Sequence, residues 1–186
     1  MTISENLINK FNRIATGSSE LKKKYTILAG SFFLIITALF VIVPVWLGQY
    51  LGIHRFIHHT ARYIVSFPLM LLGFFLVIWS NVHFRKVKGT PVPFNPPPNL
   101  VTTGPFAYTR NPMTTGLFLL MFGLGFHAGS ALSVFIFTPL YIIIHILELK
   151  YVEEPEIEKR LGQEYLEYKK KVPMVFPYKG KYHQGT

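Results

Sequence analysis

The sequence contains no cysteine and no aspartate, and acidic residues are scarce. Without cysteine the fold has no disulfide, no thiol nucleophile and no cysteine-ligated zinc or iron–sulfur cluster. All nine acidic residues are glutamates, and none lies between Leu21 and Leu147. A carboxylate in the middle of a hydrocarbon layer costs about 2.5 to 3.5 kcal/mol on insertion scales, so this acid-free stretch is typical of a region that enters a membrane.

The rest of the composition is apolar and basic. Half of the 186 residues are hydrophobic and 15% are charged, whereas a soluble domain has about 25% charged residues. The formal net charge of +10 fits either a nucleic acid or an anionic membrane surface as partner. The hydropathy decides in favour of a membrane, and we expect a single-domain membrane protein that does not bind nucleic acid.

Long apolar runs predict transmembrane helices, since about 20 apolar residues cross a bilayer core. Residues 25–47 and 63–84 are two such runs, so we expect two transmembrane helices within residues 25–84. Residues 85–112 are rich in proline and predict a cytosolic loop. Residues 113–149 are too long for one span and are interrupted by "HAGS", which predicts a transmembrane helical hairpin.

Both ends of the chain have apolar residues at helical spacing. In residues 1–24 these residues are Ile3, Leu7, Phe11 and Ile14. They predict an interfacial amphipathic helix, with a frayed polar tail as the alternative. In residues 150–186 they are Ile157, Leu161, Tyr165 and Tyr168, which predict an amphipathic helix on the membrane surface or against the domain. The expected fold class is an all-α integral membrane protein with about four transmembrane helices and an amphipathic helix at each end.

Basic residues orient the predicted spans. Of the 19 lysines and arginines, all but Arg55 and Arg62 lie in the N-terminal segment, the proline-rich loop or the C-terminal tail. Cytoplasmic segments of membrane proteins are rich in Lys and Arg. We therefore expect both termini and the loop at residues 85–112 on the cytoplasmic side.

Three histidines, His54, His58 and His59, follow the first predicted span and suggest a metal site. His54 and His58 share a helix face, but no cysteine or carboxylate lies nearby in the sequence to complete a ligand set. We therefore expect interfacial histidines beside lipid headgroups and no metal.

Polar residues gather at the mouth of the predicted hairpin. The stretch "GPFAYTRNPM" enters its first helix, and "EEP" leaves its second. Because a hairpin returns its ends to one membrane face, Arg110 and Asn111 should lie close to Glu153 and Glu154. Charged residues at a membrane boundary are costly unless they are paired or hydrated, so these residues predict a polar cavity. The alternative is that Arg110 reaches a lipid phosphate and that the glutamates only start the last helix.

The order of "LV..GPFAYTRNPM..G", a hydrophobic hairpin and "EEP.IEKRLGQEYLEYKKKVP...P" resembles the isoprenylcysteine carboxyl methyltransferase and phospholipid methyltransferase superfamily. The resemblance covers the chain from Gly89 to Pro177, and the lead "GTPVPFNPPPNLV" is similar to small bacterial members. It implies a membrane enzyme that uses S-adenosyl-L-methionine. The implied acceptor is amphiphilic, such as an isoprenylcysteine carboxylate or a lipid.

The resemblance also assigns residues to two walls of a cofactor pocket. It implies that the family's tyrosine–arginine–histidine–proline motif forms one wall, at Tyr108, Arg110, Asn111 and Pro112. It implies that Glu153 and Glu154 form the other wall, with a carboxylate available to the α-ammonium of the cofactor. Gly104 shapes the loop that closes over the pocket, and Arg110 and Glu154 are the implied catalytic residues.

Two positions depart from the motif of the superfamily. Asn111 stands where histidine is usual, so an imidazole is absent while a hydrogen-bond donor and acceptor remain. Thr114 stands where tyrosine is frequent, which removes an aromatic wall. Both departures bear on the identity of the methyl acceptor more than on cofactor binding.

The chemistry of the acceptor decides which further residues are needed. Methyl transfer from a sulfonium is an in-line displacement, so the protein must align the reacting groups and exclude water. A carboxylate acceptor needs only a positioned partner such as Arg110. An amine acceptor, as in a phospholipid amine N-methyltransferase, must lose a proton, and His145 and Glu148, one helical turn apart, are the candidate substrate residues. An NADPH-dependent enzyme similar to sterol reductases and a non-enzymatic membrane scaffold are the remaining alternatives.

Overall fold

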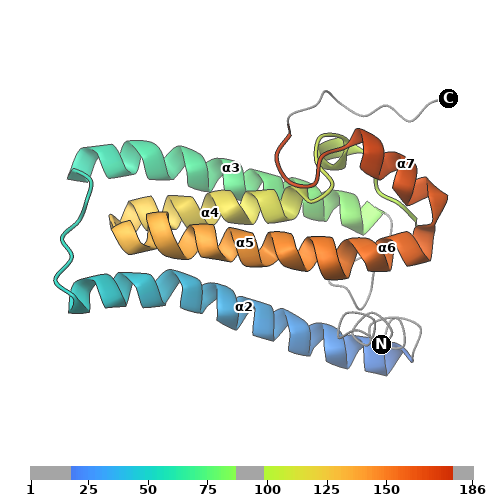
Figure 1. Cartoon of the computed structure of the whole chain (residues 1–186), viewed down its shortest axis with the longest axis horizontal. Coiled ribbons are helices and arrows are strands. Elements are labelled where there is room, and N and C mark those ends of the chain that lie inside the picture. Colours follow the sequence, from blue (N-terminus) through green and yellow to red (C-terminus); the bar gives the residue numbers. More distant parts are fainter. Residues whose placement is uncertain (1–17, 87–98, 178–186) are drawn as a thin grey trace. The chain divides into compact units, whose positions relative to one another are not determined.

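The computed structural model describes residues 18–86 and 99–177, and the regular elements in these ranges are all helices (Figure 1). No strand occurs in these two ranges, so the predicted all-α class is confirmed. The elements are, in chain order, α2 Ser19–Tyr50, α3 His59–Lys86, the 3-10 helix η1 Gly104–Ala107, α4 Pro112–Ala128, the π-helix η2 Ser133–Phe137, α5 Thr138–Glu148, the π-helix η3 Leu149–Glu153, α6 Glu154–Leu161 and α7 Gln163–Lys171.

Three helical stretches are long and apolar enough to cross a membrane, namely Lys23–Tyr50, His59–Arg85 and Ser133–Leu161. α4 is apolar but shorter, with 17 residues, which is at the lower limit of about 17 to 25 residues for a span. Length and composition therefore support three spans, and a fourth span formed by α4 stays a prediction.

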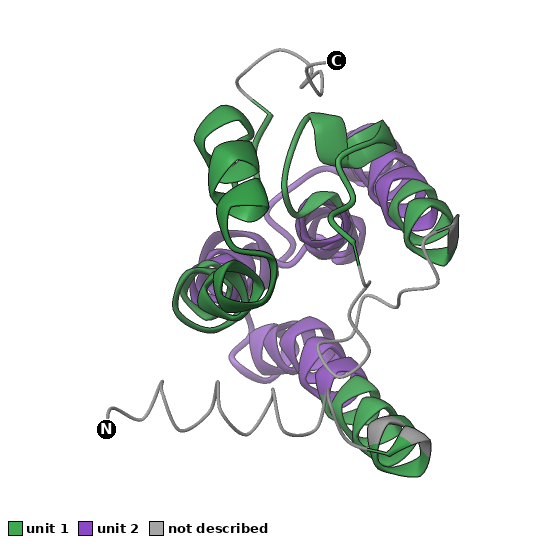
Figure 2. Ribbon diagram, turned by 90° about the vertical axis from the view of Figure 1, so that its right-hand side faces the viewer, with its two compact units in different colours: residues 1–32, 79–112, 146–186 green, residues 33–78, 113–145 purple. Residues whose placement is uncertain are grey.

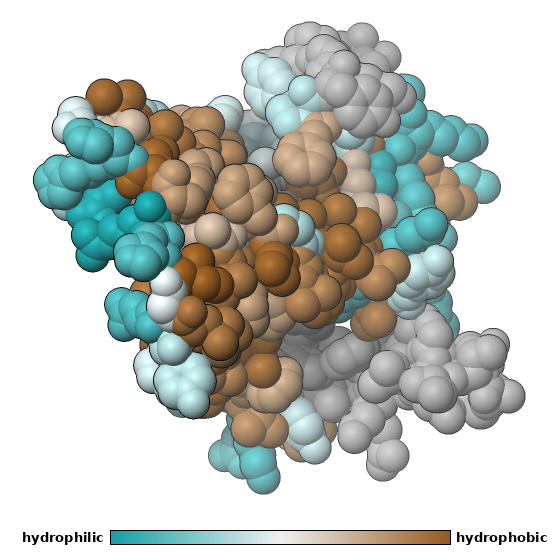
Figure 3. All heavy atoms as spheres, turned by 60° about the vertical axis from the view of Figure 1, so that its left-hand side comes forward, coloured by the Kyte–Doolittle hydropathy of each residue, from teal (hydrophilic) through white to brown (hydrophobic). Residues whose placement is uncertain are grey.

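The outer surface of the long helices is apolar. Figure 3 shows hydrophobic residues, in brown, over much of the face that it presents. Leu34 on α2 is 67% exposed and Leu71 on α3 is 73% exposed. Exposed leucines on long apolar helices suit hydrocarbon rather than water. The chain is accordingly an integral membrane protein.

α2 begins before the predicted start at residue 25. Ser18 caps the helix, because its Oγ accepts a hydrogen bond from the Leu21 N–H at 3.3 Å. Most of the predicted N-terminal interfacial helix, residues 1–17, lies outside the described residues, as do residues 87–98 of the proline-rich loop.

The turn of the hairpin agrees with the prediction, and the chain after it differs from the prediction in two ways. The chain turns after α4 at Gly129, where φ is +66°, inside the expected "HAGS" break. The following helix then passes residue 149 and continues to Leu161. The amphipathic helix predicted after it is present but divided, because Gly162 separates α6 from α7. The φ of Gly162 is +59°, a conformation that a helix does not use and that glycine adopts without a steric penalty.

The chain forms two compact units (Figure 2). Unit 1 comprises Met1–Phe32, Trp79–Pro112 and Ile146–Thr186, and unit 2 comprises Phe33–Ile78 and Met113–His145.

Unit 2 is a set of closely packed helical segments. A Cβ atom on Gly73 of α3 would lie 2.7 Å from the backbone oxygen of Gly116 on α4, so only glycine allows this approach of the two backbones. Thr37 on α2 and Tyr141 on α5 share a hydrogen bond of 2.9 Å between their hydroxyls. Tyr141 is 1% exposed, so this polar contact lies within the apolar packing of the unit.

Candidate active site

The first half of "GPFAYTRNPM" is a turn of 3-10 helix, and its end starts α4. Pro105 lies in the first turn of η1 and Pro112 is the first residue of α4. Proline suits both places, because its φ is fixed and the first N–H groups of a helix have no partner within the helix. The two prolines therefore set the ends of a short connection, and Arg110 lies within it.

Arg110 forms a buried ion pair with Glu154 inside unit 1. Its Nε donates to Glu154 Oε1 at 2.9 Å, and its Nη2 contacts the same oxygen. Its Nη1 donates to the backbone carbonyls of Lys169, at 3.0 Å, and of Val172. The side chains of Arg110 and Glu154 are only 8% and 3% exposed. The contact expected between Arg110 and Glu154 is confirmed, and each guanidinium nitrogen has a partner within the protein.

A second cation occupies the other oxygen of Glu154. Lys169 Nζ lies 2.8 Å from Glu154 Oε2 and also pairs with Glu158. Burial by itself lowers the pKa of Lys169, but its hydrogen bonds to the two glutamates and their charges raise this pKa above the ordinary value. Both carboxylate oxygens of Glu154 are therefore paired with a cation from the protein itself.

The segment that follows α7 runs beside the "TRN" residues. The Arg110 N–H donates to Pro173 O at 2.8 Å and the Asn111 N–H donates to Met174 O at 3.1 Å. Thr109 Oγ1, at 3.0 Å, and Asn111 Nδ2, at 3.1 Å, donate to the same Met174 oxygen. Asn111 thus uses its side-chain donor on the C-terminal segment. The sequence alone assigned no role in the site to this segment. Its contacts are made by backbone carbonyl oxygens, which every residue type has.

α7 packs against the domain through its tyrosines. Of the two placements expected for the C-terminal helix, on the membrane surface or against the domain, the second is the one observed. Tyr165, Tyr168 and Val172 form a buried cluster with Leu100, Ile157 and Leu161 packed against it. Tyr168 Oη donates to the Phe106 carbonyl of η1 at 2.6 Å. Burial raises the pKa of Tyr165, and the nearby charge of Glu154 raises it further.

Gly104 packs against His83, a residue that sequence reasoning did not select. The φ of Gly104 is +63°, and a Cβ atom there would lie 2.2 Å from His83 Nε2. His83 Nδ1 lies 2.9 Å from the Trp79 carbonyl. A carbonyl only accepts, so Nδ1 carries a hydrogen and donates it to this oxygen. The glycine itself was the only sequence signal for this close approach.

The π-helix η3, Leu149–Glu153, lies directly before Glu154. A π turn is wider than an α turn and rotates the residues that follow it, and such turns are frequent at functional sites. Glu154 is 2% exposed and faces Arg110. Glu153 is half-buried, and no hydrogen bond or ion pair joins its carboxylate to the rest of the described chain. The two neighbouring glutamates are therefore in different environments.

A cavity of about 460 Å³ lies beside Arg110 in unit 1. Its lining combines cationic groups with apolar ones, namely Arg110, Ile146, Lys169, Lys170, Val172, Pro173, Met174, Val175 and Phe176. Small-molecule sites of about 300 to 1,000 Å³ with this kind of mixed lining are usual. Among the residues predicted for the site, Arg110 alone lines this cavity in the described part of the chain.

The remaining predicted residues lie in several places. Tyr108 is 39% exposed, directly after η1. His145 belongs to unit 2, where its ring centroid lies 4.1 Å from that of Tyr141. Its Nδ1 lies 3.1 Å from the Tyr141 carbonyl and must donate to it, which leaves the Nε2 lone pair. Glu148 is the last residue of α5 and belongs to unit 1.

Metal ligands do not cluster in residues 18–86 and 99–177, where no group of three or more His, Asp or Glu side chains could hold an ion. His58 lies on the connection between α2 and α3, and the neighbouring His59 begins α3. The His59 ring packs edge-on against Tyr63 at 5.0 Å.

Comparison with known proteins gives one match. The family model described as "Phospholipid methyltransferase" matches residues 61–164, which is more than half of the chain. The matched range contains "YTRNPM" and "EEP", the two motifs that meet at the Arg110–Glu154 pair. No curated protein and no solved structure matches the chain.

Proposed function

Because the chain belongs to the phospholipid methyltransferase family, we propose that it is an S-adenosylmethionine-dependent methyltransferase embedded in a membrane. Its acceptor is amphiphilic, such as an isoprenylcysteine carboxylate or another lipid. The observation that carries this proposal is the buried contact between Arg110 and Glu154, which joins the two motifs of the matched region. No feature of the described residues favours a nicotinamide cofactor instead.

The groups around this contact suit the chemistry of S-adenosylmethionine. Lys170 lies at the cavity as a cation for the α-carboxylate, since charge-assisted hydrogen bonds are the strong ones. Ile146 and Phe176 offer apolar surface for an adenine ring. The carboxylate of Glu153 has no ion pair within the described chain and is the one that we assign to the α-ammonium. When bound, the cofactor supplies a methyl group on a positively charged sulfur.

Arg110 and Glu154 contribute by fixing the walls of the site. The Arg110 guanidinium ties α6, the end of α7 and the segment after α7 to one point. This arrangement keeps the reacting groups aligned and excludes water, which is most of what an in-line displacement requires. Gly104, Tyr108, Asn111 and Pro112 complete the proposed cofactor wall, with Asn111 acting through its bond to Met174.

The acceptor determines whether a base takes part. A carboxylate acceptor is already a nucleophile, and a cation such as Lys169 is sufficient to orient it. An amine acceptor, as in a phospholipid amine N-methyltransferase, must first give up a proton. His145 has a lone pair on Nε2 for this purpose, and Glu148 is the second candidate.

We also propose that the site opens to the cytoplasm, with both termini on that side. All but two of the lysines and arginines lie in segments assigned to that side. Tagging of either terminus, followed by labelling of intact cells with a membrane-impermeant reagent, tests this orientation.

Calorimetric titration of the detergent-purified protein with S-adenosylmethionine tests the proposal. We expect saturable binding that Glu153→Gln weakens by about tenfold or more, because an ammonium loses its carboxylate. Glu156→Gln is the matched control, since Glu156 lies on α6 and pairs with Arg160. Binding of NADPH in place of S-adenosylmethionine would indicate a reductase, and binding of neither would indicate a scaffold.

A further inference from the structure

A second polar site lies in unit 2, at the first turn of α3. Arg62 is only 7% exposed, and its Nε has no hydrogen-bond partner within residues 18–86 and 99–177. Its Nη2 donates to Tyr63 Oη at 3.0 Å, and its Cζ lies 4.8 Å from the centroid of the Tyr63 ring. A tyrosine offsets only part of the cost of burying a guanidinium, because it carries no negative charge. One helical turn on, Ser66 is fully buried and its Oγ also has no partner.

Unit 2 offers Arg62 no counter-ion. Phe33–Ile78 and Met113–His145 contain no aspartate and no glutamate, and no ion pair involves Arg62 in the described residues. The start of α3 adds positive potential, because its first turn has no acidic residue and its N–H groups point outward. A side chain on a helix points back toward the N-terminus, and the guanidinium of Arg62, in the first turn of α3, lies against the Tyr63 ring.

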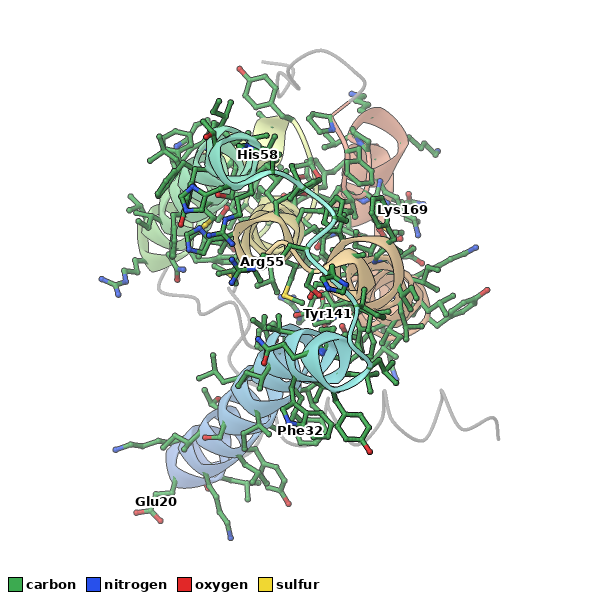
Figure 4. All side chains as sticks on the ribbon, turned by 90° about the vertical axis from the view of Figure 1, so that its left-hand side faces the viewer. Glu20, Phe32, Arg55, His58, Tyr141 and Lys169 are labelled. Carbon is green, nitrogen blue, oxygen red and sulfur yellow. The ribbon has the colours of Figure 1, made fainter. Side chains whose placement is uncertain are left out.

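A second arginine approaches the same end of the unit. The Cβ, Cγ and Cδ of Arg55 lie 3.2 to 3.4 Å from where a Cβ on Gly129 would stand, so its stem rests on the turn after α4. The Tyr63 ring, which holds the Arg62 guanidinium, lies 5.3 Å from the ring of His127, close to that turn in sequence. Figure 4 labels Arg55 and His58 on the α2–α3 connection. Two arginines and a helix start therefore lie at the same end of unit 2, which contains no carboxylate.

We propose that this end of unit 2 binds the phosphate of a membrane phospholipid headgroup. The Arg62 guanidinium and the first N–H groups of α3 donate to phosphate oxygens, and Arg55 supplies the second cation. Phosphate suits this donor set, because its oxygens accept several charge-assisted hydrogen bonds at once and guanidinium matches their geometry. A lipid is the favoured source, because the arginines lie where the apolar helices α2, α3 and α4 end. The site shares no residue with the cavity beside Arg110.

Native mass spectrometry of detergent-purified protein with added phosphatidylglycerol tests this site. We expect wild type to retain one lipid and Arg62→Gln to bind it about tenfold more weakly, because a charged hydrogen-bond donor is lost. Arg85→Gln is the matched control, since Arg85 is an exposed arginine near the other end of α3 and should leave binding unchanged. Equal lipid retention by wild type and Arg62→Gln would overturn the proposal.

Two further measurements complete the test, one on an Arg55 variant and one with inorganic phosphate. Arg55 is exposed, so Arg55→Gln should fold normally and bind about fivefold more weakly. Wild-type affinity in Arg55→Gln would count against the site even if Arg62→Gln failed to fold. Inorganic phosphate forms the third arm. Thermal stabilisation by phosphate alone, with no retained lipid, would overturn the assignment to a headgroup.

Discussion

Replacing Glu154 by glutamine should destabilise the protein strongly, although the two side chains have almost the same shape. Arg110 is 8% exposed and keeps two backbone carbonyls as partners, but it loses the one carboxylate that pairs with it in the described part of the chain. Removing one partner of a buried ion pair costs about 3 to 5 kcal/mol. Glutamine retains an acceptor oxygen, so the lower value of about 3 kcal/mol applies. For a chain of this length that loss lowers the thermal midpoint by about 6 to 12 °C.

The assay is thermal unfolding of the detergent-solubilised protein. Size-exclusion chromatography measures the fraction that remains monodisperse after heating to each temperature. Glu156→Gln is the control, because Glu156 pairs with Arg160 on α6 at 3.1 Å. The side chain of Arg160 is 24% exposed and that of Glu156 is 12% exposed. A more exposed pair one turn apart contributes only about 0.3 to 0.5 kcal/mol. If Glu154→Gln unfolded within about 2 °C of Glu156→Gln, the ion pair would not hold the site together.

Other substitutions and conditions test separate parts of the site. Gly104→Ala should cost about 2 to 5 kcal/mol, because a Cβ would lie 2.2 Å from His83 Nε2 at a positive φ. Gly162 also has a positive φ but open space around it, so Gly162→Ala should cost only about 1 to 2 kcal/mol in the same thermal assay; equal losses would contradict the close packing. Tyr168→Phe should cost about 1 to 3 kcal/mol in denaturant titrations, because it leaves a buried η1 carbonyl without its donor; an unchanged midpoint would show that the bond contributes nothing. Raising the pH should destabilise the fold above about pH 10, because the folded state keeps the Tyr165 proton, whose pKa is raised, after the unfolded chain has lost it. Tyr165→Phe should flatten this alkaline loss above about pH 10, and an identical slope would refute the assignment.

The topology of the site could be predicted because it depends on side-chain patterns. Apolar runs located the long helices, and a break at "HAGS" placed the turn that Gly129 makes. A hairpin with such a turn brings its two ends together, and that alone placed Arg110 next to Glu154. The family match to residues 61–164 then agrees with the resemblance seen in the two motifs.

The details of the site depend on backbone geometry, which side-chain patterns do not encode. The π-helix Leu149–Glu153 fixes the direction of Glu154, and no residue type marks a π turn. Met174 holds Asn111 through a carbonyl oxygen, which every residue has. Gly162 divides α6 from α7, and a lone glycine in a helical pattern predicts a break only weakly.

Methyl transfer itself is the most direct test of the central claim. Purified protein is incubated with S-adenosylmethionine labelled on its methyl group and with a lipid extract that contains phospholipids and a prenylcysteine analogue. We predict label in the organic phase, with less label when Glu153→Gln replaces wild type and no reduction for Glu156→Gln. Label that stays in the aqueous phase with folded wild-type protein would contradict a lipid methyltransferase.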